Sequence, residues 1–235
     1  MSLRLRVEQL RVTYGSRTVV DVDELEAEAG RLAVVVGDAG SGKSTLAAAL
    51  AGAVSSRGRV AVDGRAVWGP PSQRRRLGLA AALRDGSRVS GCTVAEALRL
   101  AAGGTHRDRG ALERFPQLAG RRDVMAQLLS GGEQQLLRVA GAWCAAPLVL
   151  ILDSPTVGLA PDAADAVTRL AREEAERGAA VVWLEQDRRA GPEPPRLHLA
   201  HGRIGPAQGS GGADSAGSGV TLAPGTSDVP RRSLS

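Results

Sequence analysis

A glycine-rich segment in the first quarter of the chain has residues of the right type and spacing to hold a row of phosphates. It reads Gly37-Asp38-Ala39-Gly40-Ser41-Gly42-Lys43-Ser44-Thr45. Glycines let the backbone turn its N–H groups toward phosphate oxygens, and a serine hydroxyl can reach a magnesium ion. The spacing of Gly37, Gly42, Lys43 and Ser44 is that of a P-loop, and it predicts binding of a nucleoside triphosphate with Mg²⁺.

Lys43 is the only lysine among 30 basic residues, so every other cation with a fixed charge is arginine. A compact ammonium fits between phosphate oxygens, whereas a guanidinium is a broad planar fork. The elements that must position this lysine are also predictable. The apolar run 32–36 favours a buried strand before the loop, and residues 46–51 favour a helix that ends at Gly52. This context argues against the alternative of a glycine-rich turn that binds nothing.

Composition limits the class of protein. A length of 235 residues with 43% hydrophobic residues fits one α/β domain with additions. The net charge of +5 comes from interleaved acids and bases, and aromatics make up only 2%, so we expect no nucleic-acid partner. Cys92 and Cys144 match no metal spacing and suit a reduced, cytosolic protein. No signal peptide is visible, and no apolar run approaches the roughly twenty residues that span a bilayer.

Hydrophobic patterns predict alternating strands and helices along the chain. Expected strands are 3–14, 18–29, 32–36, 59–63, 77–83, 148–152, 179–184 and a pair within 197–204. Expected helices after the first are 93–102, 130–146 and 160–177, with loops at 103–110 and 191–195. Strands separated by helices favour a mostly parallel, doubly wound sheet with nucleotide at its carboxyl edge. From residue 205 the Gly/Ser/Pro-rich composition predicts a disordered tail.

A second phosphate-binding motif is predicted at Ser130-Gly131-Gly132-Glu133. Ser130 and Glu133 have the spacing of a capping box, and the two glycines leave bare N–H groups at a helix start. The alternative is an ordinary helix cap. One triphosphate rarely needs two such ends from one chain, so a dimer is expected in which each Ser-Gly-Gly covers the phosphate held by the other P-loop.

Asp153 ends an apolar strand twenty residues after the second motif and can hold Mg²⁺ through water. The P-loop, Ser-Gly-Gly-Glu-Gln and strand-end aspartate, in this order, resemble the ATP-binding subunit of ABC transporters over residues 3–204. The resemblance implies ATP and Mg²⁺ as ligands, with Ser44 and Asp153 toward the metal. It implies an α/β fold with a P-loop NTPase core, a mostly parallel sheet, an antiparallel β subdomain and a helical subdomain near 85–135. The ATP-binding domain is then 1–204, with the tail at 205–235.

The likeness is greatest to subunits of branched-chain amino acid importers, and urea and short-amide importers share much of it. It is carried by segments 115–118, 128–135, 158–161 and 184–187. The resemblance implies that Tyr14 stacks on adenine, although a strand-end core residue is the alternative. Gln186 takes the place of the switch histidine, and residues 130–133 act in trans. Implied partners are a second ATP-binding subunit in a homo- or heterodimer, membrane permease subunits and, indirectly, a solute-binding protein. The implied location is cytoplasmic, peripheral on the inner face of the cell membrane.

The chain departs from this family at residues that matter for catalysis. Ser154 stands where the family has the glutamate that polarises the attacking water. Arg84, or its neighbour Asp85, stands near the position of a Gln or Glu that touches Mg²⁺ and faces the membrane subunit. The segment after residue 102 is short, which implies a trimmed helical subdomain, and Gly141 replaces an arginine.

These departures leave several functions open. One is an energising importer subunit, either an ordinary ATPase with some divergence or a degenerate subunit that binds ATP well and hydrolyses it poorly. Another is a regulatory module that does not hydrolyse ATP. A third, a soluble ABC protein of ribosomes or DNA repair, is disfavoured because that class usually carries two cassettes or a long coiled-coil insertion.

Overall fold

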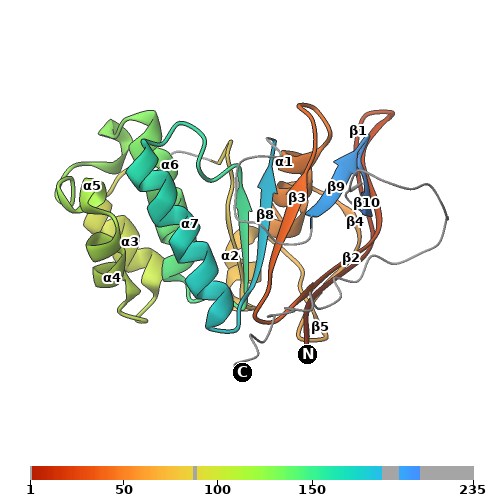
Figure 1. Cartoon of the computed structure of the whole chain (residues 1–235), viewed down its shortest axis with the longest axis horizontal. Coiled ribbons are helices and arrows are strands. Elements are labelled where there is room, and N and C mark those ends of the chain that lie inside the picture. The colour runs from red at the N-terminus through yellow and green to blue at the C-terminus, as the bar shows by residue number, and fades with distance from the viewer. Residues whose placement is uncertain (1, 87–88, 187–195, 207–235) are drawn as a thin grey trace, which may run out of the picture.

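The computed structural model describes residues 2–86, 89–186 and 196–206, and its centre is a six-stranded sheet in the order β10-β9-β3-β8-β7-β6. The strands β9, β3, β8, β7 and β6 run parallel, and β10 pairs antiparallel with β9. This confirms the mostly parallel core (Figure 1). The bounds are β3 Leu32–Val36, β6 Leu79–Ala82, β7 Val149–Asp153, β8 Ala180–Glu185, β9 Arg196–Ala200 and β10 Arg203–Pro206.

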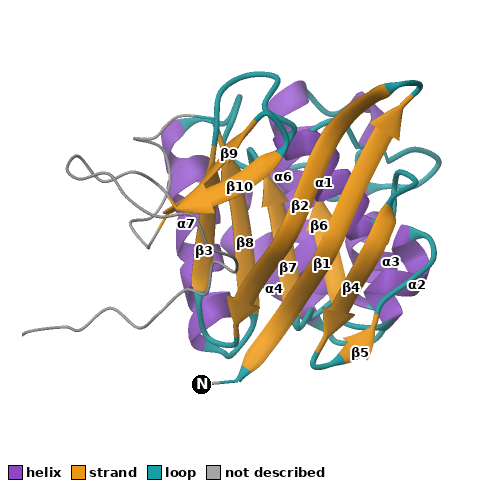
Figure 2. Cartoon of the chain, turned by 90° about the vertical axis from the view of Figure 1, so that its right-hand side faces the viewer, coloured by secondary structure: helices purple, strands orange, loops and turns teal. Residues whose placement is uncertain are grey.

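A second sheet of four antiparallel strands, in the order β2-β1-β4-β5, confirms the predicted antiparallel subdomain (Figure 2). Alternating apolar residues of its long first strand, Leu5 and Val7 followed by Leu10 and Val12, are buried, as expected for a strand with one face on the core. The bounds are β1 Leu3–Tyr14, β2 Arg17–Glu28, β4 Arg57–Val62 and β5 Arg65–Ala66.

Helices cover both faces of the central sheet. Helix α1 packs between the two sheets, and α3 to α7 gather on the opposite face (Figure 1). Each face of the central sheet therefore buries its own apolar core, which explains why β7 and β8 are continuously hydrophobic. The bounds are α1 Lys43–Ala51, α2 Pro71–Arg76, α3 Val94–Ala102, α4 Arg107–Arg114, α5 Pro116–Ala119, α6 Gly131–Cys144 and α7 Pro161–Glu176.

Both predicted capping boxes are present. Thr93 accepts from the backbone N–H of Glu96 at the start of α3, and Ser130 accepts from that of Glu133 at the start of α6. In each case the glutamate also accepts from the backbone N–H of the capping residue, at 2.8 Å. Two helix starts were therefore predictable from local sequence alone.

Three expectations need correction. The loop predicted for 103–110 is wrong in its second half, because α4 begins at Arg107. The domain end predicted at 204 is too early, because β10 continues through Pro206. Helix α2 and strand β5 were not anticipated at all. The predicted loop 191–195 and the predicted tail from residue 207 onward lie outside the described residues.

The helical layer is tied together by a buried carboxylate, Glu174 of α7. It accepts the indole N–H of Trp143 from α6 at 2.9 Å and a guanidinium N–H of Arg107 from α4 at 2.8 Å. The guanidinium carbons of Arg107 and Arg114 lie 5.0 and 5.2 Å from the centre of the Trp143 ring. This cluster explains how α4 forms in a stretch with glycines on both sides, because its arginines are held by residues distant in sequence.

Candidate functional site

The P-loop, the end of β7 and the end of β8 meet at the carboxyl edge of the central sheet, around a cavity of about 380 Å³. The sequence predicted a nucleotide site at this edge. The described residues that line the cavity include predicted site residues from four separate segments. The full set of described lining residues is Val19, Ala39, Gly40, Gly42, Lys43, Ser44, Thr45, Arg84, Ser154 and Gln186.

Lys43 is the first residue of α1 and is buried. Its Nζ donates to the carbonyls of Gly37 and Asp38 at 2.7 and 2.8 Å and to the hydroxyl of Ser41 at 3.1 Å. Burial lowers the pKa of Lys43, and the nearby carboxylates of Asp153 and Glu185 oppose this shift. The loop therefore fixes the Lys43 ammonium with two backbone carbonyl oxygens and one hydroxyl.

Two positions of the loop require glycine because the backbones of other strands approach them closely. A Cβ on Gly37 would lie 2.3 Å from the carbonyl oxygen of Leu199 in β9. At Gly42 φ is +104°, and a Cβ would lie 2.8 Å from the carbonyl oxygen of Val19 in β2. The loop can wrap this closely only because both positions lack a side chain.

Asp153 is buried at the end of β7, where the sequence placed it. Burial raises the pKa of its carboxyl, while a hydrogen bond with the Ser44 side chain and another from the backbone N–H of Arg84 lower it. The structure thus brings together the two residues predicted to face a metal ion. A serine hydroxyl and a carboxylate at the P-loop are the oxygen ligands expected for Mg²⁺ there.

Ser154 follows at once and is also buried. Its backbone has φ of +46°, and its N–H donates to the carbonyl of Leu184 in β8 at 2.8 Å. The carbonyl of Ser154 accepts from the side-chain amide of Gln135 at 3.3 Å, which links it to α6. Ser154 therefore lines the cavity, with its backbone held by β8 and by Gln135 of α6.

The second motif lies at the exposed start of α6. Ser130 and Gly131 are exposed, and Glu133 pairs with Arg121 at 3.1 Å. Hydrogen bonds from Ser130 and Arg121 lower the pKa of Glu133. A Cβ on Gly132 would lie 2.8 Å from the carbonyl oxygen of Gly158, so the motif packs on the segment after Ser154. None of these four residues lines the described P-loop cavity.

The remaining predicted residues lie at the edges of the site. Gln186 lines the cavity just after β8. Tyr14 lies at the tip of the β1–β2 hairpin with 53% of its surface exposed, and it does not line the described cavity. Its stacking on adenine stays a prediction.

Two residues near the site were missed by sequence reasoning. Val19 lines the cavity from β2, and only the fold brings that strand to the P-loop. Glu185 is a buried acid at the end of β8, and its carboxylate accepts from the backbone N–H of Gln186 at 2.8 Å. The available signal for Glu185 was an acid at the end of an apolar strand, as for Asp153.

The two cysteines carry no further site. Both are free, and burial raises the pKa of the Cys144 thiol to about 12. Within the described ranges no three potential ligands among His, Cys, Asp and Glu cluster as a metal site. Among the described helices none is both long enough and apolar enough to cross a membrane.

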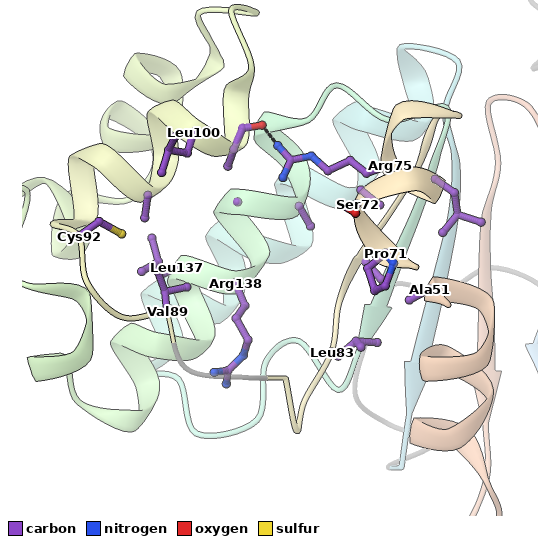
Figure 3. A pocket seen from close by; sticks show the side chains of 17 residues that line it. Ala51, Pro71, Ser72, Arg75, Leu83, Val89, Cys92, Leu100, Leu137 and Arg138 are labelled. Atoms are coloured by element: carbon purple, nitrogen blue, oxygen red, sulfur yellow. Dashed lines mark hydrogen bonds between the residues drawn. The ribbon is translucent and has the colours of Figure 1, made fainter. Parts of the chain in front are cut away.

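A larger cavity of about 480 Å³ is lined by residues of α2, β6, α3 and α6 (Figure 3). Its lining is mainly apolar, with Leu83, Leu100 and Leu137 among the larger side chains, and Arg75 and Arg138 supply charge. The guanidinium of Arg75 in α2 donates to the carbonyl of Ala101 in α3 across this groove. The groove therefore lies where the helical layer meets the nucleotide-binding core.

Comparison with known proteins gives one family. The model of the ABC transporter family matches residues 20–157. The high-affinity branched-chain amino acid transport ATP-binding protein BraG of Pseudomonas aeruginosa is 31% identical over 193 residues, covering 78% of this chain and 82% of that protein. The hemin import ATP-binding protein HmuV of Pseudomonas entomophila is 34% identical over 196 residues, covering 78% and 77%. A solved ATP-binding subunit of an ABC transporter superposes with a TM-score of 0.73 at 25% identity, covering 86% and 88%. The chain therefore belongs to the ABC transporter family, among its ATP-binding proteins.

Proposed function

We propose that this chain is the ATP-binding subunit of a solute importer, and that it binds ATP more effectively than it hydrolyses it. The P-loop cavity at the sheet edge carries the first part of this proposal. The second part rests on Ser154, which is buried beside Asp153 where a catalytic carboxylate is needed. No carboxylate lines the cavity among the described residues.

The substrate we favour is a branched-chain amino acid or a similar small solute. Similarity to BraG and the family-like segments 158–161 and 184–187 support it. Similarity to a hemin import protein of equal coverage supports the importer class without supporting one substrate. The second candidate function is a non-hydrolysing regulatory or structural partner of a competent ABC subunit, and the loss of the glutamate at Ser154 favours it.

Mg²⁺ would be held by the hydroxyl of Ser44 and, through water, by the carboxylate of Asp153. When bound, the ion would supply charge neutralisation at the terminal phosphates. Ser44 and Asp153 are hydrogen-bonded to each other, and the cation Arg84 lines the same cavity. The donor set therefore fits the metal only in part.

A second ATP-binding subunit is proposed to dock on the start of α6. The exposed N–H groups there and the 72% exposure of Leu128 beside them support this surface. The permease subunits are proposed to contact the groove between α2 and α3, whose apolar lining and two arginines suit an acidic, partly apolar segment (Figure 3). The subunit would then lie on the cytoplasmic face of the cell membrane.

Replacing Lys43 by alanine tests the ATP site. The wild-type protein is expected to be stabilised by ATP, by about 2.7 kcal/mol at a hundredfold excess over its dissociation constant. Lys43→Ala is expected to lose this stabilisation, because no other lysine in the chain can replace the ammonium. Thermal unfolding with and without ATP measures the effect.

Arg99→Ala serves as the matched control, since Arg99 is an exposed cation on α3 away from the cavity. It should respond to ATP as the wild type does. Equal stabilisation of Lys43→Ala and wild type by ATP would remove the basis of the proposed function.

The two capping boxes provide a matched test of the dimer surface. Ser130→Ala and Thr93→Ala each remove the same kind of cap and are expected to cost about 1 kcal/mol of stability. Only Ser130→Ala should also weaken ATP-dependent dimerisation, because Ser130 alone would meet the phosphate of a partner. Sedimentation in the presence of ATP measures the fraction of dimer. An equal loss of dimer in both variants would contradict the role of residues 130–133 in trans.

A further inference from the structure

Arg84 occupies the P-loop cavity. It lies in the turn that follows β6, whose last residue Ala82 pairs with Leu152 of β7. Its backbone N–H donates to the carboxylate of Asp153 at 3.4 Å, and Arg84 lines the same cavity as Lys43 and Ser44. This segment therefore lies beside Asp153, the residue predicted to hold Mg²⁺ through water.

The charged side chains that line the cavity are positive among the described residues. Lys43 and Arg84 are its cations, and among the described lining residues there is no acid. Burial lowers the pKa of Lys43, and the carboxylates of Asp153 and Glu185 beside the cavity oppose this shift. Asp153 also accepts the backbone N–H of Arg84, so Arg84 lies next to the metal-facing carboxylate and lines the same cavity as Lys43.

We propose that Arg84 supplies part of the charge neutralisation that Mg²⁺ gives elsewhere, so that ATP binds here with little dependence on a divalent cation. This inference rests on the proposed ATP site. A guanidinium can donate two parallel hydrogen bonds to phosphate oxygens, and it keeps its charge at any physiological pH. The same positive charge opposes the binding of a divalent cation next to it. Arg84 is exposed and lines the cavity, so its side chain can reach a phosphate bound there.

ATP affinity measured with and without Mg²⁺ tests this role. A fluorescent ATP analogue is titrated into the full chain in excess Mg²⁺ and in excess EDTA. The wild-type dissociation constant should change less than about threefold between the two conditions, well below the tenfold that one charged hydrogen bond is worth. In Arg84→Gln, removal of Mg²⁺ should weaken binding by about tenfold to a hundredfold, because no second cation then faces the phosphates.

Two further variants make the outcome specific. Arg84→Lys keeps the charge and should keep the weak dependence on Mg²⁺. Arg109→Gln removes an exposed arginine from α4, outside the cavity, and should behave as the wild type. A wild-type protein that loses as much affinity in EDTA as Arg84→Gln would overturn the inference. Unchanged binding by Lys43→Ala would instead show that the proposed ATP site is wrong, so the two failures can be told apart.

Discussion

Ser154→Glu is expected to raise the rate of ATP hydrolysis by about 10² to 10⁴-fold, the range that a positioned general base contributes. Ser154 lines the P-loop cavity and follows Asp153 directly. A longer side chain from this position would enter the cavity where the terminal phosphate is proposed to lie. Its carboxylate could then orient water, which a serine hydroxyl does poorly at neutral pH. Phosphate release by the purified full chain measures the gain.

Ser154→Gln is the matched control for this gain. It has the size of glutamate and no basic oxygen pair, so it should hydrolyse ATP as slowly as the wild type. A Ser154→Glu protein with unchanged turnover, at ATP concentrations that saturate the site, would contradict the view that Ser154 limits catalysis. It would favour the interpretation of this chain as an ordinary ATPase with some divergence.

Glu174→Ala is expected to destabilise the folded protein by about 3–5 kcal/mol, the cost of removing one partner from a buried ion pair. The carboxylate of Glu174 is 3% exposed and accepts from Arg107 and from the indole N–H of Trp143. Its loss would leave the buried indole N–H without an acceptor and the partly buried guanidinium of Arg107 without its counter-charge. Since domains of this kind are stable by only about 5–15 kcal/mol, urea unfolding should show a large shift.

Glu173→Ala tests whether burial causes the effect. Glu173 is the neighbouring acid on α7, and it pairs with Arg114 and Arg177 while its side chain stays 37% exposed. The expected loss is below about 1 kcal/mol, as for surface ion pairs. Similar losses in the two variants would contradict the assignment of the cluster as the link between α4, α6 and α7.

The parts of the fold that sequence predicted best are those set by neighbours in the chain. The strand, loop and helix around Lys43 and the capping boxes at Thr93 and Ser130 depend on residues a few positions apart. Strand-end Asp153 was predictable for the same reason, because a continuous apolar run ends there.

The parts that sequence missed depend on distant partners. Helix α4 begins in a stretch whose sequence predicts a loop. Its arginines contact Trp143, Glu173 and Glu174, which are distant in sequence. Helix α2 contains three successive arginines, and the guanidinium of Arg74 is buried against the carbonyls of Ala49 and Leu50 at the end of α1. No local pattern marks such an arginine as buried. The place of Arg84 was likewise open until the pairing of β6 with β7 fixed it.

The three hydrogen bonds of Lys43 have a consequence for chemical labelling. An amine attacks an acylating reagent through its lone pair, and an ammonium whose hydrogens are donated to Gly37, Asp38 and Ser41 has none to offer. Apart from the α-amino group, Lys43 is the only primary amine in the chain. The acylation rate of its side chain, followed by mass spectrometry, therefore reports how often this one loop opens, without any engineered probe.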